Sequence, residues 1–405
     1  MDFIKNIFKG DRVIWIIFLM LCLVSIVEVF SASSTLIYKT GDHWGPISRH
    51  CLFLMAGAVF VWGTHLIPYR WFQAIPFVLL PLSVVMLVLV MFMARVNNAA
   101  RWMEVAGVQF QPSEFAKMAV VVVTAYILSK GQTDEGADPK AFKRIMLIAG
   151  VVCLLILPEN FSTAALLGGV VFLMMLIGGI QIRKLLMLAG SIGAAAVLGV
   201  ALLMLTKNVD IPLAHRMDTW RARIEKFCSS EQVPPQLFDI NRDSQVGHAR
   251  IAVATSHLIG KGPGNSVQRD FLSQAYSDFI YAIIIEELGL LGGAFVAFLY
   301  FLLLIRAGRI ARQCRHSFAA FLALGIALLL VGQALFNMMV AVGLAPVTGQ
   351  PLPLISRGGT STLINCVYIG MLLSVSRYVD ELNNNEKEHE NEGQIIPYSG
   401  TESQG

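Results

Sequence analysis

Charged residues are scarce in this 405-residue chain. Only 14% of the residues are charged, against about a quarter in ordinary soluble domains, while 56% are hydrophobic and the mean hydropathy is +0.65. So little charge over this length excludes a soluble multi-domain protein. We therefore interpret the chain as an integral membrane protein.

Regularly spaced metal ligands are missing as well. The six cysteines are scattered and form no C-x-x-C pair, which excludes a disulfide framework and a zinc knuckle. The eight histidines show no ligand spacing, so no His metal site is predicted. The net charge of +4 is too small to indicate a nucleic-acid-binding surface.

Long apolar runs recur instead along most of the chain. Each is about 20 residues long, which is enough for a helix to cross a hydrocarbon core about 30 Å thick. Hydropathy predicts about ten such spans and an all-α polytopic fold. The expected spans are 13–32, 50–68, 71–94, 112–129, 143–158, 162–181, 184–206, 276–305, 317–344 and 358–377.

Basic residues are concentrated in alternate connections between these spans. One side holds the clusters Lys140 to Arg144, Arg183 with Lys184, and Arg306 to Arg315, whereas the short connections of the other side hold few. The positive-inside rule then predicts both termini in the cytoplasm. No cleavable signal peptide is expected, because the first apolar run is long and lacks a small-residue cleavage pattern.

The expected organisation is a membrane domain over 1–379 and a disordered cytoplasmic tail over 380–405. Residues 207–275 form a large outer loop, far longer than a connection between neighbouring helices. Its apolar segments predict a partly ordered cap. The tail is charged and poor in apolar residues, as disordered segments are.

The stretch from Tyr276 to Gly293 carries carboxylates into an apolar helix. An unpaired carboxylate at membrane depth costs about 2.5 kcal/mol or more. The presence of Asp278, Glu286 and Glu287 therefore requires an explanation, and a catalytic role is one. Ser277 with Asp278 is also an ordinary helix start, since both side chains can accept from free backbone N–H groups. Both interpretations stay open at this point.

A second charged helix start has the sequence QPSEFAK. Pro112 suits a first helical turn, and Glu114 and Lys117 share one face, so they can pair inside the membrane. A purely structural ion pair is the alternative. Arg101 supplies a further cation just upstream on the same outer side.

Two segments rich in glycine or proline complete the outer side. Residues 346–361, PVTGQPLPLISRGGTS, cannot form regular helix, and such backbone survives at membrane depth only where it is buried or lines a wet cavity. Residues 260–266, GKGPGNS, could cradle a phosphate, although a flexible turn is the alternative. Cations and helix N-termini gathered there suit a lipid-linked diphosphate, and a carboxylate could take a proton from a sugar hydroxyl.

The motifs QPSEFAK, NAARW, GKGPGNS followed by YSDFIYAIIIEELGLLGG, and VTGQPLPLISRGGTS together resemble the SEDS family of bacterial polytopic proteins. The resemblance covers nearly the whole chain. It implies a peptidoglycan glycosyltransferase that polymerises lipid II at the outer face of the cytoplasmic (inner) membrane. The implied partners are a class B penicillin-binding protein, which acts as the transpeptidase, and other divisome proteins. The motif wording and the charged tail favour the family's division branch, acting at the septum, over its elongation branch.

The resemblance also implies roles for individual residues. Asp278 falls on the family's catalytic aspartate, and Glu114 and Lys117 fall on positions that matter for activity, with Arg101 and Ser277 in support. No metal site and no certain cofactor are predicted, while Mg²⁺ or Mn²⁺ stays open. Candidate ligands of the substrate diphosphate are Arg216, Arg250, Lys261, Ser356 and Arg357.

Three features depart from the family pattern. Arg357 stands where most members have tyrosine, residues 158–163 replace the usual Pro-Asp-x-Gly-Thr, and residues 228–239 are an extra stretch.

Two other functions are alternatives to the glycosyltransferase. A lipid II flippase would also need intramembrane charges and broken helices, although no inverted repeat is evident. A scaffold would use buried charges only to specify the fold.

Overall fold

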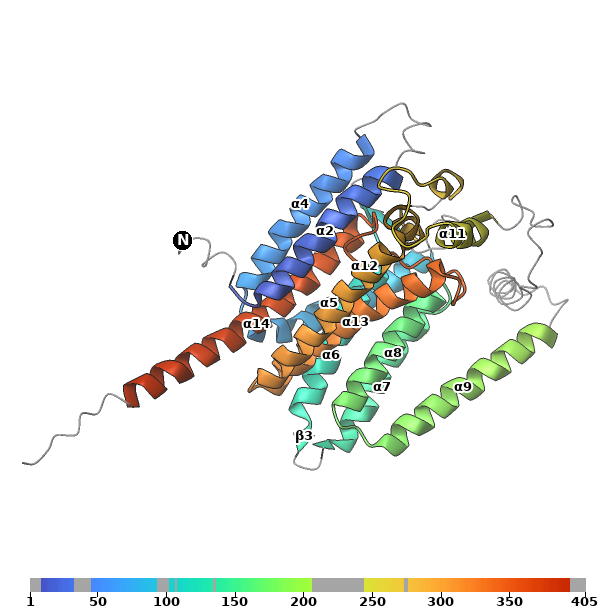
Figure 1. Cartoon of the computed structure of the whole chain (residues 1–405). Helices are drawn as coiled ribbons and strands as arrows, with labels where there is room; N and C mark the ends of the chain where they lie inside the picture. Colours follow the sequence, from blue (N-terminus) through green and yellow to red (C-terminus); the bar gives the residue numbers. More distant parts are fainter. Residues whose placement is uncertain are drawn as a thin grey trace, which may run out of the picture.

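A computed structural model describes residues 9–32, 45–92, 102–105, 108–133, 136–205, 244–272 and 276–393. These ranges form a bundle of long helices with two short hairpins (Figure 1). The helices before the large loop are α2 (Arg12–Ala32), α4 (Gly45–Leu66), η1 (Tyr69–Ala74), α5 (Ile75–Met91), α6 (Pro112–Lys130), α7 (Pro139–Ile156), α8 (Phe161–Ile177) and α9 (Ile182–Leu205). Those that follow are α11 (Ser244–Ala254), η2 (Gln268–Phe271), α12 (Ile280–Gln313), α13 (Ser317–Ala341) and α14 (Thr360–Gly393). The antiparallel hairpins pair β1 (Met103–Val105) with β2 (Val108–Phe110), and β3 (Gln132–Thr133) with β4 (Gly136–Ala137).

The predicted all-α polytopic fold is confirmed, and every predicted apolar run lies on a helix. Among the described residues, eight helices are long and apolar enough to cross a membrane. Helix α8 has 17 residues, and α7 begins with Lys140, Lys143 and Arg144, which lower its apolar character. The structure therefore does not establish the predicted number of ten spans.

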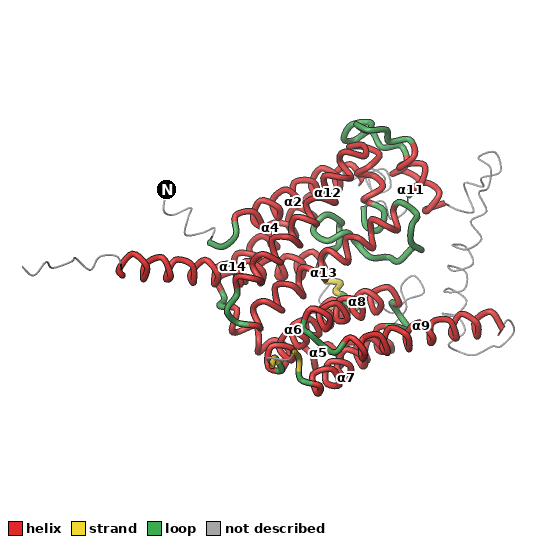
Figure 2. Tube along the Cα trace, turned by 60° about the horizontal axis from the view of Figure 1, so that its bottom comes forward, coloured by secondary structure: helices red, strands yellow, loops and turns green. Residues whose placement is uncertain are grey.

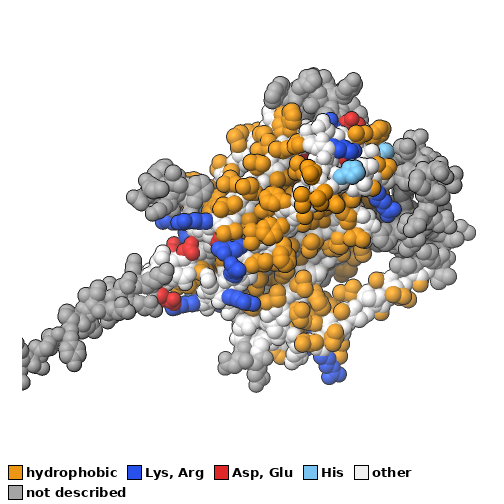
Figure 3. Space-filling view, in the orientation of Figure 1, with side chains coloured by type: hydrophobic (Ala, Val, Ile, Leu, Met, Phe, Trp, Pro, Cys, Tyr) orange, Lys and Arg blue, Asp and Glu red, His pale blue; other side chains and the backbone are white. Residues whose placement is uncertain are grey.

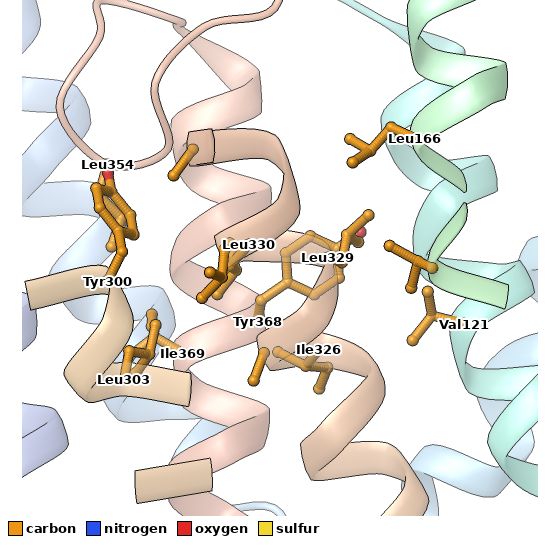
Figure 4. Packing of buried hydrophobic residues seen from close by; sticks show 14 of the residues in the cluster. Val121, Leu166, Tyr300, Leu303, Ile326, Leu329, Leu330, Leu354, Tyr368 and Ile369 are labelled. Atoms are coloured by element: carbon orange, nitrogen blue, oxygen red, sulfur yellow. The ribbon is translucent and has the colours of Figure 1, made fainter. Parts of the chain in front are cut away.

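The core lies where α6, α12, α13 and α14 meet (Figure 4). Tyr300 of α12 and Tyr368 of α14 are both almost fully buried there. Because lipid tails are as apolar as leucine, close packing rather than the hydrophobic effect joins such helices. Gly370 shows this at the crossing of α14 with α4, since a Cβ atom added there would lie 2.8 Å from the carbonyl oxygen of Val61.

Helix α9 stands apart from this bundle (Figures 1 and 2). Its contacts with the neighbouring α8 are few, and only 6% of its apolar window is buried. Val197 near its middle has 73% of its surface exposed. A helix that is apolar on all sides and this exposed needs lipid or another protein around it.

The two ends of the bundle differ in charge. One end, which we term the basic end, carries Arg70, Arg183, Lys184, Arg306, Arg309, Arg312, Arg315 and Arg377 (Figure 3 shows part of it). The opposite end, termed the loop end, carries α11 and the connection over 342–359. The described chain starts at the basic end, where Arg306 Nε donates to Asp11 Oδ2 at 2.8 Å.

Helix α14 is longer than its apolar run. It continues past residue 380, where the charged tail was expected to begin, to Gly393 and projects from the bundle (Figure 1). Pairs such as Arg377 with Glu381, one helical turn apart at 3.5 Å, support it. Residues 394–405 lie outside the described part.

Candidate active site

Asp278 lies in the turn that leads into α12 and is partly exposed. The N-cap position of α12 falls on Phe279, and no side chain caps that helix end. The ordinary helix-start interpretation of Asp278 therefore does not account for its position. Ser277 Oγ donates to Asp278 Oδ1 at 2.9 Å, which orients the carboxylate.

The backbone of this turn is held from two other segments. Asn337 Nδ2, in α13, donates to the carbonyl oxygen of Asp278 at 2.9 Å. Ser356 Oγ donates to the carbonyl oxygen of Ser277 at 2.6 Å, and the Arg357 N–H donates to that of Tyr276 at 3.0 Å. Three hydrogen bonds to consecutive carbonyl groups leave the position of the turn little freedom.

The segment predicted to be irregular, 346–361, supplies two of these bonds. The chain is irregular over 342–359, and residues 352–356 within it are buried. Asn337 Nδ2 also donates to the carbonyl oxygen of Gln350 at 2.7 Å, and Gln350 Nε2 donates to Thr163 Oγ1 at 2.5 Å. Tyr300 donates its hydroxyl hydrogen to the carbonyl oxygen of Pro353 from below (Figure 4). Leu354 adopts φ +65°, a left-handed conformation that costs a non-glycine residue about 1–3 kcal/mol.

Glu114 and Lys117 form the predicted ion pair, with 2.8 Å between Oε1 and Nζ and almost no exposure. Lys117 Nζ also donates to Gln333 Oε1 at 2.9 Å, and Gln333 Nε2 donates to the carbonyl oxygen of Pro351 at 3.1 Å. The pair is thus connected through α13 to the irregular segment that holds the Asp278 turn. It acts at the site as a support.

Several buried polar atoms around this support have no hydrogen-bond partner within the described residues. They come from the start of α6, from α13, from the irregular segment and from α14. Such atoms are uncommon in folded proteins, and their concentration here distinguishes this region from the apolar core. They are Ser113 Oγ, Glu114 Oε2, Asn337 Oδ1, Gln350 Oε1, Asn365 Oδ1 and the Tyr368 hydroxyl.

Arg357 adjoins the Asp278 turn, and the charge of Arg49 acts on Arg357. The guanidinium carbon of Arg357 lies 5.5 Å from the centroid of the Tyr276 ring. Burial lowers the pKa of the Arg357 guanidinium from its usual value, and the positive charge of Arg49 lowers it further, while Tyr276 opposes both. Neither arginine forms an ion pair with a described carboxylate. Their uncompensated charge suits an anion.

Arg250 adds a third cation at the loop end. It is exposed on α11, and its guanidinium packs against Gly343, where an added Cβ atom would lie 2.8 Å from Nε. Helix α11 rests on α12 and on η2, where the rings of His248 and Phe271 stack 4.9 Å apart. The candidates Arg101 and Arg216 lie outside the described residues.

The glycine-rich residues 260–266 do use backbone N–H groups to bind an anion, but the anion is part of the chain. The N–H groups of Gly264 and Ser266 donate to the Glu287 carboxylate at 2.8 and 3.2 Å. Ser266 Oγ donates to Glu286 Oε2 at 2.5 Å, and Lys261 Nζ pairs with Glu286 Oε1 at 2.5 Å. We term Glu286, Glu287 and residues 260–269 the glutamate clamp. Lys261, a predicted diphosphate ligand, is placed against Glu286 instead.

A break in α12 makes the clamp possible. Gly289 has φ +74° and ψ −178°, so the helix loses its regular hydrogen bonds there. The N–H groups of Lys261 and Gly262 satisfy the freed carbonyl oxygens of Glu286 and Glu287, at 3.0 and 2.8 Å. A Cβ atom at Gly289 would lie 2.3 Å from the carbonyl oxygen of Leu258, so glycine is required for this approach.

Some of these residues were not singled out by sequence reasoning. Gln333 and Asn337 carry the hydrogen-bond network, and Arg49 supplies a cation. A signal for the two amides was available, because polar side chains four residues apart in an apolar span share one helix face. No group of three or more His, Cys, Asp or Glu side chains suited to a metal occurs in the described ranges, and the expected role of a divalent cation stays untested.

The fold and the site define a polytopic membrane protein whose bundle carries, at one end, a carboxylate and arginines that pair with none of the described carboxylates. The family model described as cell cycle protein, of FtsW, RodA and SpoVE, matches residues 11–381. The chain belongs to this family.

Relatives and solved structures agree with this assignment. A probable peptidoglycan glycosyltransferase FtsW of Halomonas elongata is 34% identical over 366 residues, covering 88% of each chain. One of Trichlorobacter lovleyi with the same description is 33% identical over 373 residues, covering 90% of this chain and 93% of its own. A chain of a peptidoglycan synthase complex superposes with a TM-score of 0.71 at 23% identity, covering 91% of this chain and 98% of its own. The rod shape determining protein RodA of Thermus thermophilus gives 0.64 at 22% identity, covering 92% and 98%.

Proposed function

We propose that this protein is a peptidoglycan glycosyltransferase that polymerises lipid II for septal wall synthesis, together with a class B penicillin-binding protein. Curated relatives that cover most of the chain are described as probable enzymes of this activity. The observation that carries the proposal is the partly exposed Asp278, on a turn held by hydrogen bonds from two other segments.

In the proposed reaction, Asp278 is the general base. Its carboxylate takes the proton of the GlcNAc 4-hydroxyl of one lipid II, and that oxygen bonds to the anomeric carbon of the MurNAc on the growing strand. The bond from this carbon to the diphosphate breaks, and undecaprenyl diphosphate leaves with the electron pair. Attack opposite the leaving group inverts the anomeric centre.

The other site residues have supporting roles in this proposal. Arg357, Arg49 and Arg250 stabilise the charge of the departing diphosphate. Ser356, also expected as a diphosphate ligand, is buried and donates its hydroxyl hydrogen to the carbonyl oxygen of Ser277, so it holds the turn instead. Arg101 and Arg216 stay candidates for the same role. Ser277 orients the base, and Glu114 with Lys117 fixes the irregular segment through Gln333.

We also propose an orientation and a partner surface. If the basic end faces the cytoplasm of a bacterial inner membrane, Asp278 lies at the outer side, where lipid II is consumed. A stripe of exposed apolar side chains along α12, one helical turn apart, could receive the partner's single membrane span. It consists of Leu291, Phe295, Phe298, Phe301 and Ile305.

The test is glycan-strand synthesis from purified lipid II, with and without the cognate transpeptidase. We expect Asp278→Asn to lower the rate by about 10²–10⁴, the usual contribution of a general base. Asp270→Asn removes an exposed carboxylate from the same end of the bundle and should retain activity. Full activity of a folded Asp278→Asn variant would refute the role of Asp278. If no condition gives polymer while lipid II crosses liposome membranes, the protein is a flippase.

A further inference from the structure

A pocket lies at the basic end, far along the bundle from Asp278. Its volume is about 290 Å³, and it is an open pocket between η1 and residues 374–385 of α14. Its polar lining includes Tyr69, Arg70, Ser374, Arg377, Tyr378 and Glu381. No step of the proposed reaction uses this pocket.

The charges of the pocket do not balance. Arg70 is exposed and forms no ion pair with any described residue. Arg377 has a buried Nε without a hydrogen-bond partner, and its only described carboxylate neighbour, Glu381, is 3.5 Å away and 63% exposed. Two guanidinium groups against one carboxylate leave a net charge of +1, which matches one phosphodiester.

The position of the pocket is that of a lipid headgroup. Apolar side chains that follow directly in sequence, Trp71, Phe77 and Val78, each have about 70% of their surface exposed, as lipid-facing residues do. The rings of Tyr69 and Tyr378 lie 4.5 Å apart in the lining of the pocket, and tyrosine is typical of the membrane interface. Basic pockets between membrane helices at the cytoplasmic side are known to hold anionic headgroups.

We propose that this pocket binds the phosphate headgroup of an anionic membrane lipid, whose acyl chains extend along the exposed face of α5. Arg70 and Arg377 pair with the phosphate oxygens, and the tyrosine hydroxyls donate to them. The proposal is independent of the glycosyl transfer reaction, because it involves none of the residues around Asp278.

The test is native mass spectrometry of the full-length protein with equimolar phosphatidylglycerol and phosphatidylcholine. We expect selective retention of phosphatidylglycerol, weakened about fivefold in Arg70→Gln, since one basic residue at a membrane surface contributes about that factor. Arg309→Gln is the matched control, because Arg309 is an exposed arginine of the same end that does not line the pocket. It should retain the lipid as the wild type does.

Other outcomes would overturn the proposal. Equal losses in both variants would mean that only general surface charge attracts the lipid. Displacement of the lipid by millimolar inorganic phosphate would assign the pocket to a soluble anion. If an acidic peptide were retained in preference to phosphatidylglycerol, the pocket would be a protein-binding site. Tyr378→Phe gives a second measurement, because it removes one donor while keeping the ring, and unchanged retention in it would refute the assigned contacts.

Discussion

The carboxylates within α12 and the one in the turn before it have opposite environments. Glu286 and Glu287 are fully buried and are surrounded by hydrogen-bond donors of the glutamate clamp, with Lys261 and Arg269 nearby. Asp278, two helical turns away, is partly exposed, and its neighbours hold its backbone. A carboxylate whose oxygens accept hydrogen bonds from neighbouring residues of the chain stabilises the structure, whereas a carboxylate on a fixed but accessible turn can act in catalysis.

The largest expected effect would sharpen this contrast. Glu286→Ala leaves Lys261 and the donors of Ser266, Val267 and Gln268 without their acceptor, so we expect about 3–5 kcal/mol less stability. Thermal unfolding in detergent measures this loss, and limited proteolysis should cut within 244–272. Asp278→Ala should unfold at the wild-type temperature. If Asp278→Ala were the less stable variant, the contrast would be wrong.

Gly289→Ala tests the helix break that supports the clamp. The backbone at φ +74° and the approach of Leu258 leave no room for a methyl group, so we expect a loss of about 2–4 kcal/mol from strain and overpacking. Gly308→Ala, in a regular part of the same helix with open space around it, should be neutral or slightly stabilising. Equal unfolding temperatures for the two variants would mean that α12 does not need the break.

The contrast also shows how far the sequence predicts such a site. Hydropathy located the helices, the three-residue spacing predicted the pair of Glu114 with Lys117, and proline and glycine predicted an irregular segment over 346–361, which the structure shows over 342–359. The glutamate clamp was not predicted, because it joins residues about 20 positions apart and depends on the break at Gly289. The sequence predicted chemistry at Glu286 and Glu287 because it does not reveal the loop residues that pair with these carboxylates in the folded structure.

The helical continuation of α14 beyond residue 380 was not predicted for a related reason. Its composition is charged and poor in apolar residues, which is typical of disorder. Glutamate and lysine are also good helix formers, and a helix already started in the membrane needs no new nucleus to continue. The small contact of α9 with the bundle could not be predicted either, because its apolar sequence does not differ from that of a helix packed inside the bundle.

Asn337→Asp tests the link between α13 and the Asp278 turn. Aspartate has the same shape but no N–H to donate to the carbonyl oxygens of Asp278 and Gln350, which costs about 1–3 kcal/mol. We expect polymerisation to fall more than this loss of stability explains. Asn383→Asp, the same change at an exposed position of α14, is the control for added charge. Unchanged activity of a folded Asn337→Asp variant would show that the turn does not need this support.

The smallest expected effect comes from two tyrosine substitutions. Comparing them distinguishes a residue that positions the active site from one that only stabilises the fold. Tyr300→Phe removes the hydroxyl that donates to Pro353 in the irregular segment, and Tyr281→Phe removes one that donates to Gly293 within α12 at 3.1 Å. Each change should cost about 1 kcal/mol, because each removes one hydrogen bond to a carbonyl oxygen.

Their effects on activity should nevertheless differ. Pro353 lies three residues before Ser356, which holds the Asp278 turn, so a shift of the segment moves the base. We therefore expect slower glycan synthesis in Tyr300→Phe than in Tyr281→Phe at equal unfolding temperatures. Equal activities would mean that the segment keeps its position without Tyr300, and that Asn337 and Ser356 alone fix the Asp278 turn.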